Sequence, residues 1–244
     1  MLRAALIALL LPLTAFADEG GWPIEIIKRP PTLPSGMFRL QADASVRFFE
    51  RGGGMMMESE SETDIGLAVG GGYGISNEFE IGAAYGFIAD EGDLEGELSL
   101  YGEYKFLDGA VDVAGTGGLV YDLGSESGRL LLGAEAQFEI GDRFAIYTPG
   151  YQLAIGIFND GDTPISLSLP VGIRLQFTPQ IFGFAQTTVA TIGIKDSGDS
   201  NILDEVSLLV GAFYSVSSKL DLGAALSIPE SDDIGFLFTM RLFF

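Results

Sequence analysis

The sequence predicts an all-β fold, a transmembrane antiparallel up-and-down β-barrel of about 12 strands. Three observations lead to this prediction. Long stretches alternate between apolar and polar side chains, which is the period-two pattern of a strand with two different faces. The polar faces carry many charges, as expected for strands that turn their apolar side to lipid. The connections alternate between short turns and longer acidic loops, as in outer-membrane barrels.

Composition excludes several other classes of protein. Apolar residues make up 47% of the 244 residues, yet the formal net charge is −21. The long apolar run is confined to the N-terminus, which excludes a bundle of transmembrane helices, since each needs about twenty apolar residues. The 18 phenylalanines exclude a disordered acidic chain. The negative charge disfavours nucleic-acid binding.

Two segments precede the predicted barrel. Residues 1–17 resemble a signal peptide, with Arg3, an apolar stretch at 4–13 and an A-x-A cleavage site at 15–17. An anchoring helix is the alternative, but the run is shorter than a membrane span. Residues 18–36 are predicted to be a periplasmic leader, because four prolines exclude a central strand. Either a flexible tail or a plug covering Trp22, Ile24, Ile26 and Ile27 fits this segment.

Residues 37–244 are predicted to form the barrel. In the first strand, Phe38, Leu40 and Val46 alternate with Arg39, Gln41 and Arg47. The expected strands span 37–49, 65–75, 79–87, 94–106, 111–121, 130–140, 144–158, 165–177, 181–192, 206–216, 220–228 and 234–244.

Two of these strands are irregular. Pro149 and Gly150 predict a bulge that turns Tyr151, Leu153 and Ile155 outward. In 181–192 the two faces conflict, because Phe182, Phe184 and Gln186 compete with Thr187, Val189 and Thr191 for the outward side.

The last strand ends at the chain terminus with an unbroken apolar face. Its terminal Phe resembles the signal that bacterial outer-membrane barrels present to the assembly machinery, and we assign Met240, Leu242 and Phe244 to it. Because an unpaired sheet edge is not satisfied in lipid, residues 234–244 must pair with residues 37–49.

The connections predict the orientation. The longer acidic ones, expected to be extracellular, are 51–64, 90–93, 122–128, 159–163, 195–201 and 229–233. The tight ones, expected in the periplasm together with both termini, are 76–77, 107–109, 141–142, 178–180 and 217–219. A propeller or soluble sandwich is the alternative, but its packed core would exclude the charged face of residues 94–106. Acidic segments 159–162 and 196–199 offer oxygen ligands for divalent cations without the spacing of a calcium loop, so we predict no cofactor.

Three short segments resemble a known family. The turns at 73–82, with Tyr73-Gly74-Ile75-Ser76-Asn77, and at 215–223, with Ser217-Ser218-Lys219, look like the repeated turns of the barrel family named for the meta-pathway of phenol degradation. The leader residues 29–36 are similar to leaders in such proteins. The resemblance implies an outer-membrane barrel that assists passage of small molecules, and it transfers no site residues.

Catalysis is not expected. The chain has no histidine and no cysteine, so a serine nucleophile lacks its usual base and nitrogen or sulfur ligands for metals are missing.

The inward charges are instead the candidate selectivity residues: Arg39, Arg47, Glu95, Glu97, Glu103, Lys105, Arg129, Glu135, Arg174 and Arg241. Two interpretations stay open: cross-lumen pairs that plug a narrow barrel, or a water-filled path whose acidic surplus favours cations. Arginines on the first, eighth and last strands also suggest a basic stripe facing an acidic wall.

The sequence therefore predicts an outer-membrane channel or porin-like protein for passive passage of small solutes. The alternative is a non-conducting structural or surface-interaction barrel that uses its acidic loops, and a weaker third is a carrier of hydrophobic compounds. Expected partners are outer-membrane lipid and lipopolysaccharide, the barrel-assembly machinery and a possible small-molecule solute, with no nucleic acid. The expected localisation is the bacterial outer membrane.

Overall fold

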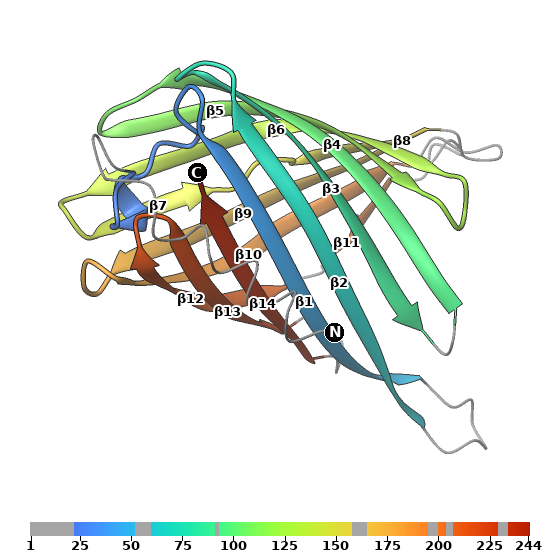
Figure 1. The fold of residues 1–244 in the computed structure, drawn as a ribbon. Helices are drawn as coiled ribbons and strands as arrows, with labels where there is room; N and C mark the ends of the chain where they lie inside the picture. Colours follow the sequence, from blue (N-terminus) through green and yellow to red (C-terminus); the bar gives the residue numbers. More distant parts are fainter. Residues whose placement is uncertain are drawn as a thin grey trace.

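The chain forms one antiparallel sheet that closes on itself. The computed structural model describes residues 22–51, 60–90, 93–157, 165–194, 200–203, 207–228 and 234–244. Strand β1 (Phe38–Arg51) pairs with β2 (Glu60–Gly74) on one side and with β14 (Ile234–Phe243), the last strand, on the other (Figure 1). Neighbours in sequence pair in the same way through β3 (Phe79–Asp90), β4 (Asp93–Leu107), β5 (Val111–Asp122), β6 (Gly128–Ile140), β9 (Ile165–Gln176), β10 (Ile181–Ile194) and β13 (Leu220–Ile228).

In the described part of the chain, fourteen strand segments occupy twelve positions around the barrel. Segments β7 (Phe144–Thr148) and β8 (Leu153–Ile157) both pair with β6 and β9, so together they are one interrupted strand. Segments β11 (Ser200–Leu203) and β12 (Leu208–Ser217) both pair with β10. The prediction of a closed 12-stranded up-and-down barrel is therefore confirmed. Among the described residues no helix is long and apolar enough to span a membrane.

The two faces of the wall have opposite character. Directly paired residues share a face, so Ala42 lies beside Met240 and Val69 on the outside, while Asp43 lies beside Thr239 and Ala68 on the inside. The outer face is dominated by exposed aliphatic and aromatic side chains. Exposed aromatics gather near the short turns: Phe38, Tyr73, Tyr104, Phe106, Phe138, Phe177, Tyr214 and Phe244. An apolar outer face with a girdle of aromatics is the pattern of a lipid-facing barrel.

The predicted bulge at Pro149 is a larger inward kink. Between β7 and β8, residues 149–152 lie opposite 133–135 of β6, and the φ of Tyr151 is +66°. Tyr151 lines the interior, so its predicted outward position is wrong. Leu153 and Ile155 pair with Leu132 and Leu130 of the outer face, as predicted. The reason is that proline has no N–H for the ladder, and the chain leaves the wall to accommodate it.

The side chain of Gln152 fills the gap that the kink leaves. Its amide donates to the carbonyl of Ala134 at 2.7 Å and accepts from the N–H of Ala134 at 2.7 Å, replacing a backbone partner. Gly133 leaves room for this, since an added Cβ would lie 2.0 Å from Gln152 Oε1. A carrier of hydrophobic compounds would need an apolar pocket near the leader or a lateral opening at this break, and the bonds of Gln152 give the lateral opening no support.

A register shift resolves the conflict in the strand at 181–192. The pairing of β10 with β9 shifts between Thr188 and Thr191. Before the shift, Phe182 is buried inside the barrel and Val189 is exposed on the outside. After the shift, Ile192 lies outside, and the hydroxyl oxygen of Thr191 is 3.3 Å from that of Ser168. Phe182, Phe184 and Gln186 therefore face inward, so their predicted outward position is wrong. Of the competing set, Thr187 and Val189 face outward, whereas Thr191, beyond the shift, faces inward.

Several predicted loop boundaries are wrong. The ladder between β1 and β2 continues to Arg51 and Glu60, and Asp90 pairs directly with Asp93. Residues 60–64 and 200–203 are strand instead of loop, because antiparallel pairing persists wherever both backbones stay in register. The loops at 159–163 and 229–233 lie outside the described residues.

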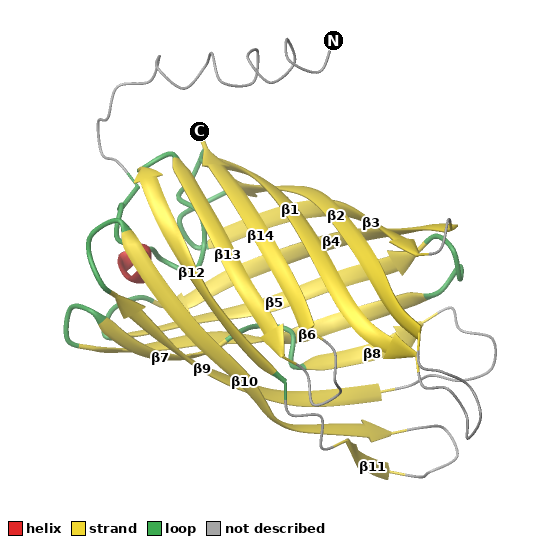
Figure 2. Cartoon of the chain, turned by 90° about the horizontal axis from the view of Figure 1, so that it is seen from below, coloured by secondary structure: helices red, strands yellow, loops and turns green. Residues whose placement is uncertain are grey.

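The leader folds into the mouth of the barrel at the short-turn end. Residues 22–36 contain one turn of 3-10 helix, η2 (Ile26–Lys28), and bury Trp22, Ile27 and Leu33 (Figure 2). The N–H of Gly36 donates to the carbonyl of Gly74 at 2.8 Å. Of the two alternatives for this segment, residues 22–36 form the plug, which covers Trp22 and Ile27 but leaves Ile24 39% exposed. Residues 1–21, with the predicted signal peptide, lie outside the described residues.

Close approach of the leader to Gly74 generates a testable prediction. A Cβ at Gly74 would lie 2.1 Å from the carbonyl oxygen of Pro34 and 2.5 Å from that of Leu33, both backbone atoms. We expect Gly74→Ala to displace the leader and raise the rate of tryptic cleavage after Lys28 in folded protein by roughly tenfold, equivalent to about 1.4 kcal/mol of docking free energy. Gly86→Ala is the control, since its nearest atom is Ala68 Cβ at 3.6 Å. Equal cleavage of both variants would contradict the docked leader.

Candidate functional site

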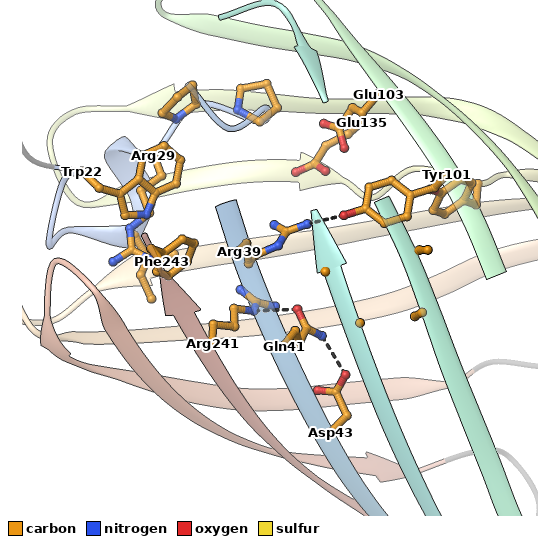
Figure 3. Close-up of a pocket in the computed structure, with 18 of the residues that line it drawn as sticks. Trp22, Arg29, Arg39, Gln41, Asp43, Tyr101, Glu103, Glu135, Arg241 and Phe243 are labelled. Carbon is orange, nitrogen blue, oxygen red and sulfur yellow. Dashed lines mark hydrogen bonds between the residues drawn. The ribbon is translucent and has the colours of Figure 1, made fainter. Parts of the chain in front are cut away.

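A cavity of about 420 Å³ occupies the barrel interior beside the leader. Its walls come from many strands, and the polar and charged side chains that line it are Arg29, Arg39, Gln41, Asp43, Tyr101, Glu103, Asp112, Glu135, Gln137, Tyr151, Arg174 and Arg241 (Figure 3). Trp22 and Phe243 form its boundary near the leader. The cavity is thus a polar chamber within a wall that is apolar outside.

Small residues on β2 and β3 make room for this chamber. Ala68, Gly70 and Ala84 line it from the wall. The ring of Tyr101 approaches the backbone of Gly82, where an added Cβ would be 2.2 Å from Tyr101 Cζ. A side chain at Gly82 would therefore force the ring of Tyr101 to move.

A buried carboxylate connects the wall to the leader. Glu80 is 1% exposed, and its Oε1 accepts from Arg39 Nη2 at 2.8 Å and from the Tyr101 hydroxyl at 2.9 Å. Its Oε2 accepts from the N–H of Leu33 at 2.9 Å. A buried charge is tolerated only when it is paired and hydrogen-bonded, and Glu80 meets both conditions through partners on three separate segments.

A second buried ion pair holds the leader from another part of the wall, strand β13. Both terminal nitrogens of Arg29 donate to the carboxylate of Asp221, Nη2 to Oδ1 at 3.0 Å, and Ser215 Oγ donates to the same oxygen at 2.8 Å. The guanidinium also lies 5.5 Å from the ring centre of Trp22 and 5.2 Å from that of Phe243. The arrangement is bidentate, which adds orientation to charge.

A third contact fixes the 3-10 turn of the leader. Gln137 Nε2 donates to the carbonyl of Ile27 at 3.0 Å, and the N–H of Ile27 donates to Gln176 Oε1 at 3.2 Å. Arg174 Nη1 donates to Gln137 Oε1 at 2.5 Å and Nη2 to Glu135 Oε1 at 3.1 Å. The Arg174 guanidinium stacks 4.0 Å from the ring centre of Tyr147.

Five of the ten predicted selectivity residues line the cavity: Arg39, Glu103, Glu135, Arg174 and Arg241. Arg129 and Glu97 form an ion pair of 3.0 Å that is largely exposed, and Lys105 pairs with Asp108 at 2.6 Å beside a short turn. Arg47 is exposed. The side chain of Glu95 lies outside the described residues.

Sequence reasoning missed four lining residues, Arg29, Tyr101, Gln137 and Tyr151. Side-chain alternation placed three further lining residues on the inward face without including them among the selectivity candidates: Gln41, Asp43 and Asp112. Tyr101 lies two residues before Glu103 on the same strand, so its side chain points to the same face, and it could have been included on that basis. Arg29 lies in the leader and Tyr151 in the kink, so no periodic pattern marks either.

The charges of the lining are balanced. Four arginines (Arg29, Arg39, Arg174, Arg241) face four carboxylates (Asp43, Glu103, Asp112, Glu135). The predicted acidic surplus is absent from this lining. Of the predicted basic stripe, Arg39 and Arg241 stand on the paired strands β1 and β14, whereas Arg174 on β9 is paired with Glu135.

The three residues assigned to the assembly signal share the outer face of the seam. Met240 and Leu242 pair with Ala42 and Leu40 of β1. Phe244 exchanges two backbone hydrogen bonds with Phe38, of 2.9 and 3.1 Å, and their ring centres are 6.2 Å apart. The predicted pairing of the last strand with the first is confirmed.

Comparison with known proteins identifies the fold. No protein-family model and no curated protein sequence matches the chain. The solved structure of the COG4313 outer membrane channel from Pseudomonas putida F1 is similar, with a TM-score of 0.60 and 13% identity over 94% of this chain and 100% of that chain. The KdgM porin in complex with disordered oligogalacturonate matches with a TM-score of 0.56 and 8% identity over 83% of this chain and 98% of that chain.

At these identities the likeness establishes a closed barrel of the same architecture. The predicted resemblance to the meta-pathway family finds no matching family model and stays a prediction.

The Arg29–Asp221 pair predicts the behaviour of a charge-removing variant. Asp221→Asn leaves a buried guanidinium without its partner, which costs about 3–5 kcal/mol for a buried pair. We expect the leader to leave its site, shifting the emission of Trp22, the sole tryptophan of the chain, to longer wavelength. The double variant Arg29→Gln/Asp221→Asn removes both charges and is expected to shift the emission less. If Asp221→Asn kept the wild-type spectrum, the pair would not hold the leader.

Proposed function

We propose that this chain is a bacterial outer-membrane channel, porin-like in character, for passive passage of small solutes. One observation carries the proposal: a cavity of about 420 Å³ lined by charged side chains lies inside a closed barrel whose outer face is apolar. The apolar outer face of such a wall can contact lipid, and its polar inner face can contact water. Arg–Glu pairs such as Arg39–Glu80 and Arg174–Glu135 then set which solutes pass.

The same wall supports the orientation and the localisation that we propose. The exposed aromatics near the short turns suit a membrane interface, and Phe38 and Phe244 stand at the strand ends there. The short turns, leader and C-terminus then face the periplasm, and the longer acidic loops face outward. Residues 1–17 act as the export signal, while outer-membrane lipid, lipopolysaccharide and the barrel-assembly machinery are the partners.

The names of the similar structures agree with a channel for polar solutes. One is an outer membrane channel and the other a porin in complex with oligogalacturonate. We propose no enzymatic activity, because the chain lacks the histidine and cysteine on which the familiar nucleophilic and metal mechanisms depend.

The leader favours a second candidate, a non-conducting structural or surface-interaction barrel. Buried contacts from Arg29 and Leu33 hold the plug against Asp221 and Glu80, and a plug held this firmly would seal the short-turn end. The acidic extracellular loops would then be the functional surface.

Planar-bilayer conductance of purified folded protein separates the two candidates. For a channel narrowed by its leader, we expect small steps from the wild type and a several-fold larger conductance from a variant lacking residues 22–36, because the cavity then opens at both ends. Gly74→Ala provides a second variant that keeps the whole chain. Absence of steps from all three proteins would exclude the channel and leave the sealed barrel.

The seam generates a further prediction about assembly. Phe244→Asp is expected to lower the amount of folded protein in the outer membrane by roughly tenfold, measured by heat-modifiable migration on gels, because the terminal residue pairs with Phe38 at the closure. Phe106→Asp is the control: Phe106 lies in the same aromatic girdle and is 63% exposed, but does not lie at the seam. If both variants lowered the amount of folded protein equally, the effect of Phe244→Asp would come from exposing a charge to lipid and not from the seam.

A further inference from the structure

The interior cavity contains polar groups of two kinds, those that the protein satisfies itself and those that it leaves free. Arg29 is held by Asp221, Arg39 by Glu80 and Arg174 by Glu135. Free groups that face a chamber are the ones available to a solute, because a bound molecule need not break an existing pair to reach them.

Among the described residues, Arg241 is the cavity arginine without an ion-pair partner within 4.0 Å. Its Nε donates to Gln41 Oε1 at 3.2 Å, and its guanidinium lies 4.6 Å from the ring centre of Phe213. Within the described residues, no carboxylate lies within 4.0 Å of it, and its two terminal nitrogens have no hydrogen-bond partner.

Two carboxylates near Arg241 are already occupied. Asp221 lies directly opposite Arg241 in the ladder of β13 and β14, and it is paired with Arg29 and accepts from Ser215 Oγ at 2.8 Å. Asp43, two residues beyond Gln41 on β1, accepts from Gln41 Nε2 at 2.7 Å and from Thr239 Oγ1 at 2.7 Å (Figure 3). These bonds hold Asp43 and Gln41 in one row along β1 and orient Arg241 through its Nε. The terminal N–H groups are left as a fork, which is the geometry that binds the two oxygens of a carboxylate.

The opposite side of the chamber offers acceptors. Glu103 has no cation within 4.0 Å, and its Oε1 has no hydrogen-bond partner in the described part of the chain. Tyr151 lies in the kink and projects into the same chamber. Its φ is +66°, a backbone conformation that a residue other than glycine adopts only under constraint. Its N–H donates to Thr116 Oγ1, but its hydroxyl makes no hydrogen bond within the described residues.

We propose that this cavity binds one small organic carboxylate that also donates hydrogen bonds, such as a hydroxy acid or an amino acid. The carboxylate pairs with the free fork of Arg241, and the hydroxyl or ammonium group faces Glu103 and the Tyr151 hydroxyl. The inference rests on the proposed channel function and names the class of solute for which its lumen is selective.

The test uses four probes with the same three-carbon skeleton: lactate, alanine, propionate and lactamide. Each is added to wild-type protein in planar bilayers, and the concentration that halves the ion current is measured. We expect lactate or alanine to act at a concentration at least about tenfold lower than propionate or lactamide, which corresponds to one charge-assisted hydrogen bond. Stronger action by alanine identifies an ammonium group as the second contact, and stronger action by lactate identifies a hydroxyl.

Variants assign the effect to the site. Arg241→Gln is expected to raise the half-blocking concentration of lactate and alanine at least about tenfold, Arg241→Lys to raise it less, and Glu103→Gln to weaken alanine more than lactate. Arg129→Gln is the matched control, since Arg129 pairs with Glu97 outside the cavity. If neither lactate nor alanine blocked more strongly than propionate, or if Arg241→Gln left their block unchanged, the proposal would be overturned.

A second readout separates this proposal from the channel function itself. Trp22 lines the cavity and is the sole tryptophan of the chain, so its fluorescence reports occupancy in detergent without any current. Saturable quenching by lactate or alanine that Arg241→Gln removes supports the binding site even where the protein does not conduct. Conduction with no saturable response of Trp22 and no selective block rejects the site and leaves the channel standing.

Discussion

Closure of the sheet is the constraint on which the rest of the structure depends. A strand edge exposes unpaired N–H and C=O groups, and an apolar solvent offers them no partner. Pairing β1 with β14 removes that edge, and the register that does so places Gln41 beside Arg241 and Phe38 beside Phe244. The same event therefore creates the enclosed interior, sets two of its polar residues side by side and joins the chain terminus to the first strand.

Charge burial inside the barrel is made possible by pairing across sequence-distant segments. Glu80 and Asp221 are almost fully buried, and each is matched by an arginine together with a neutral donor. Each also binds the leader, through Leu33 and through Arg29. The plug is thus held by interactions that are strong only while water is excluded. Docking of the leader and satisfaction of the wall are consequently coupled.

Local departures from the regular ladder give the interior its character. The kink at residues 149–152 moves Tyr151 from the outer face to the chamber, and Gln152 repairs the hydrogen bonding that the kink interrupts. The shift in β10 reverses which side chains face inward partway along the strand. A barrel tolerates these irregularities because the neighbouring strands continue in register past them.

The sequence by itself determined the closed barrel, its twelve strands, the side on which Arg39, Glu103 and Arg241 lie, and the pairing of the first strand with the last, because side-chain alternation is a local property of each strand. Only the tertiary structure decided which charges meet. Arg29 reaches Asp221 across 192 positions, and Arg129 meets Glu97 away from the cavity. Which charged residues pair depends on the shear of the barrel, on the kinks in its strands and on the docked leader. None of these features produces a periodic pattern in the sequence.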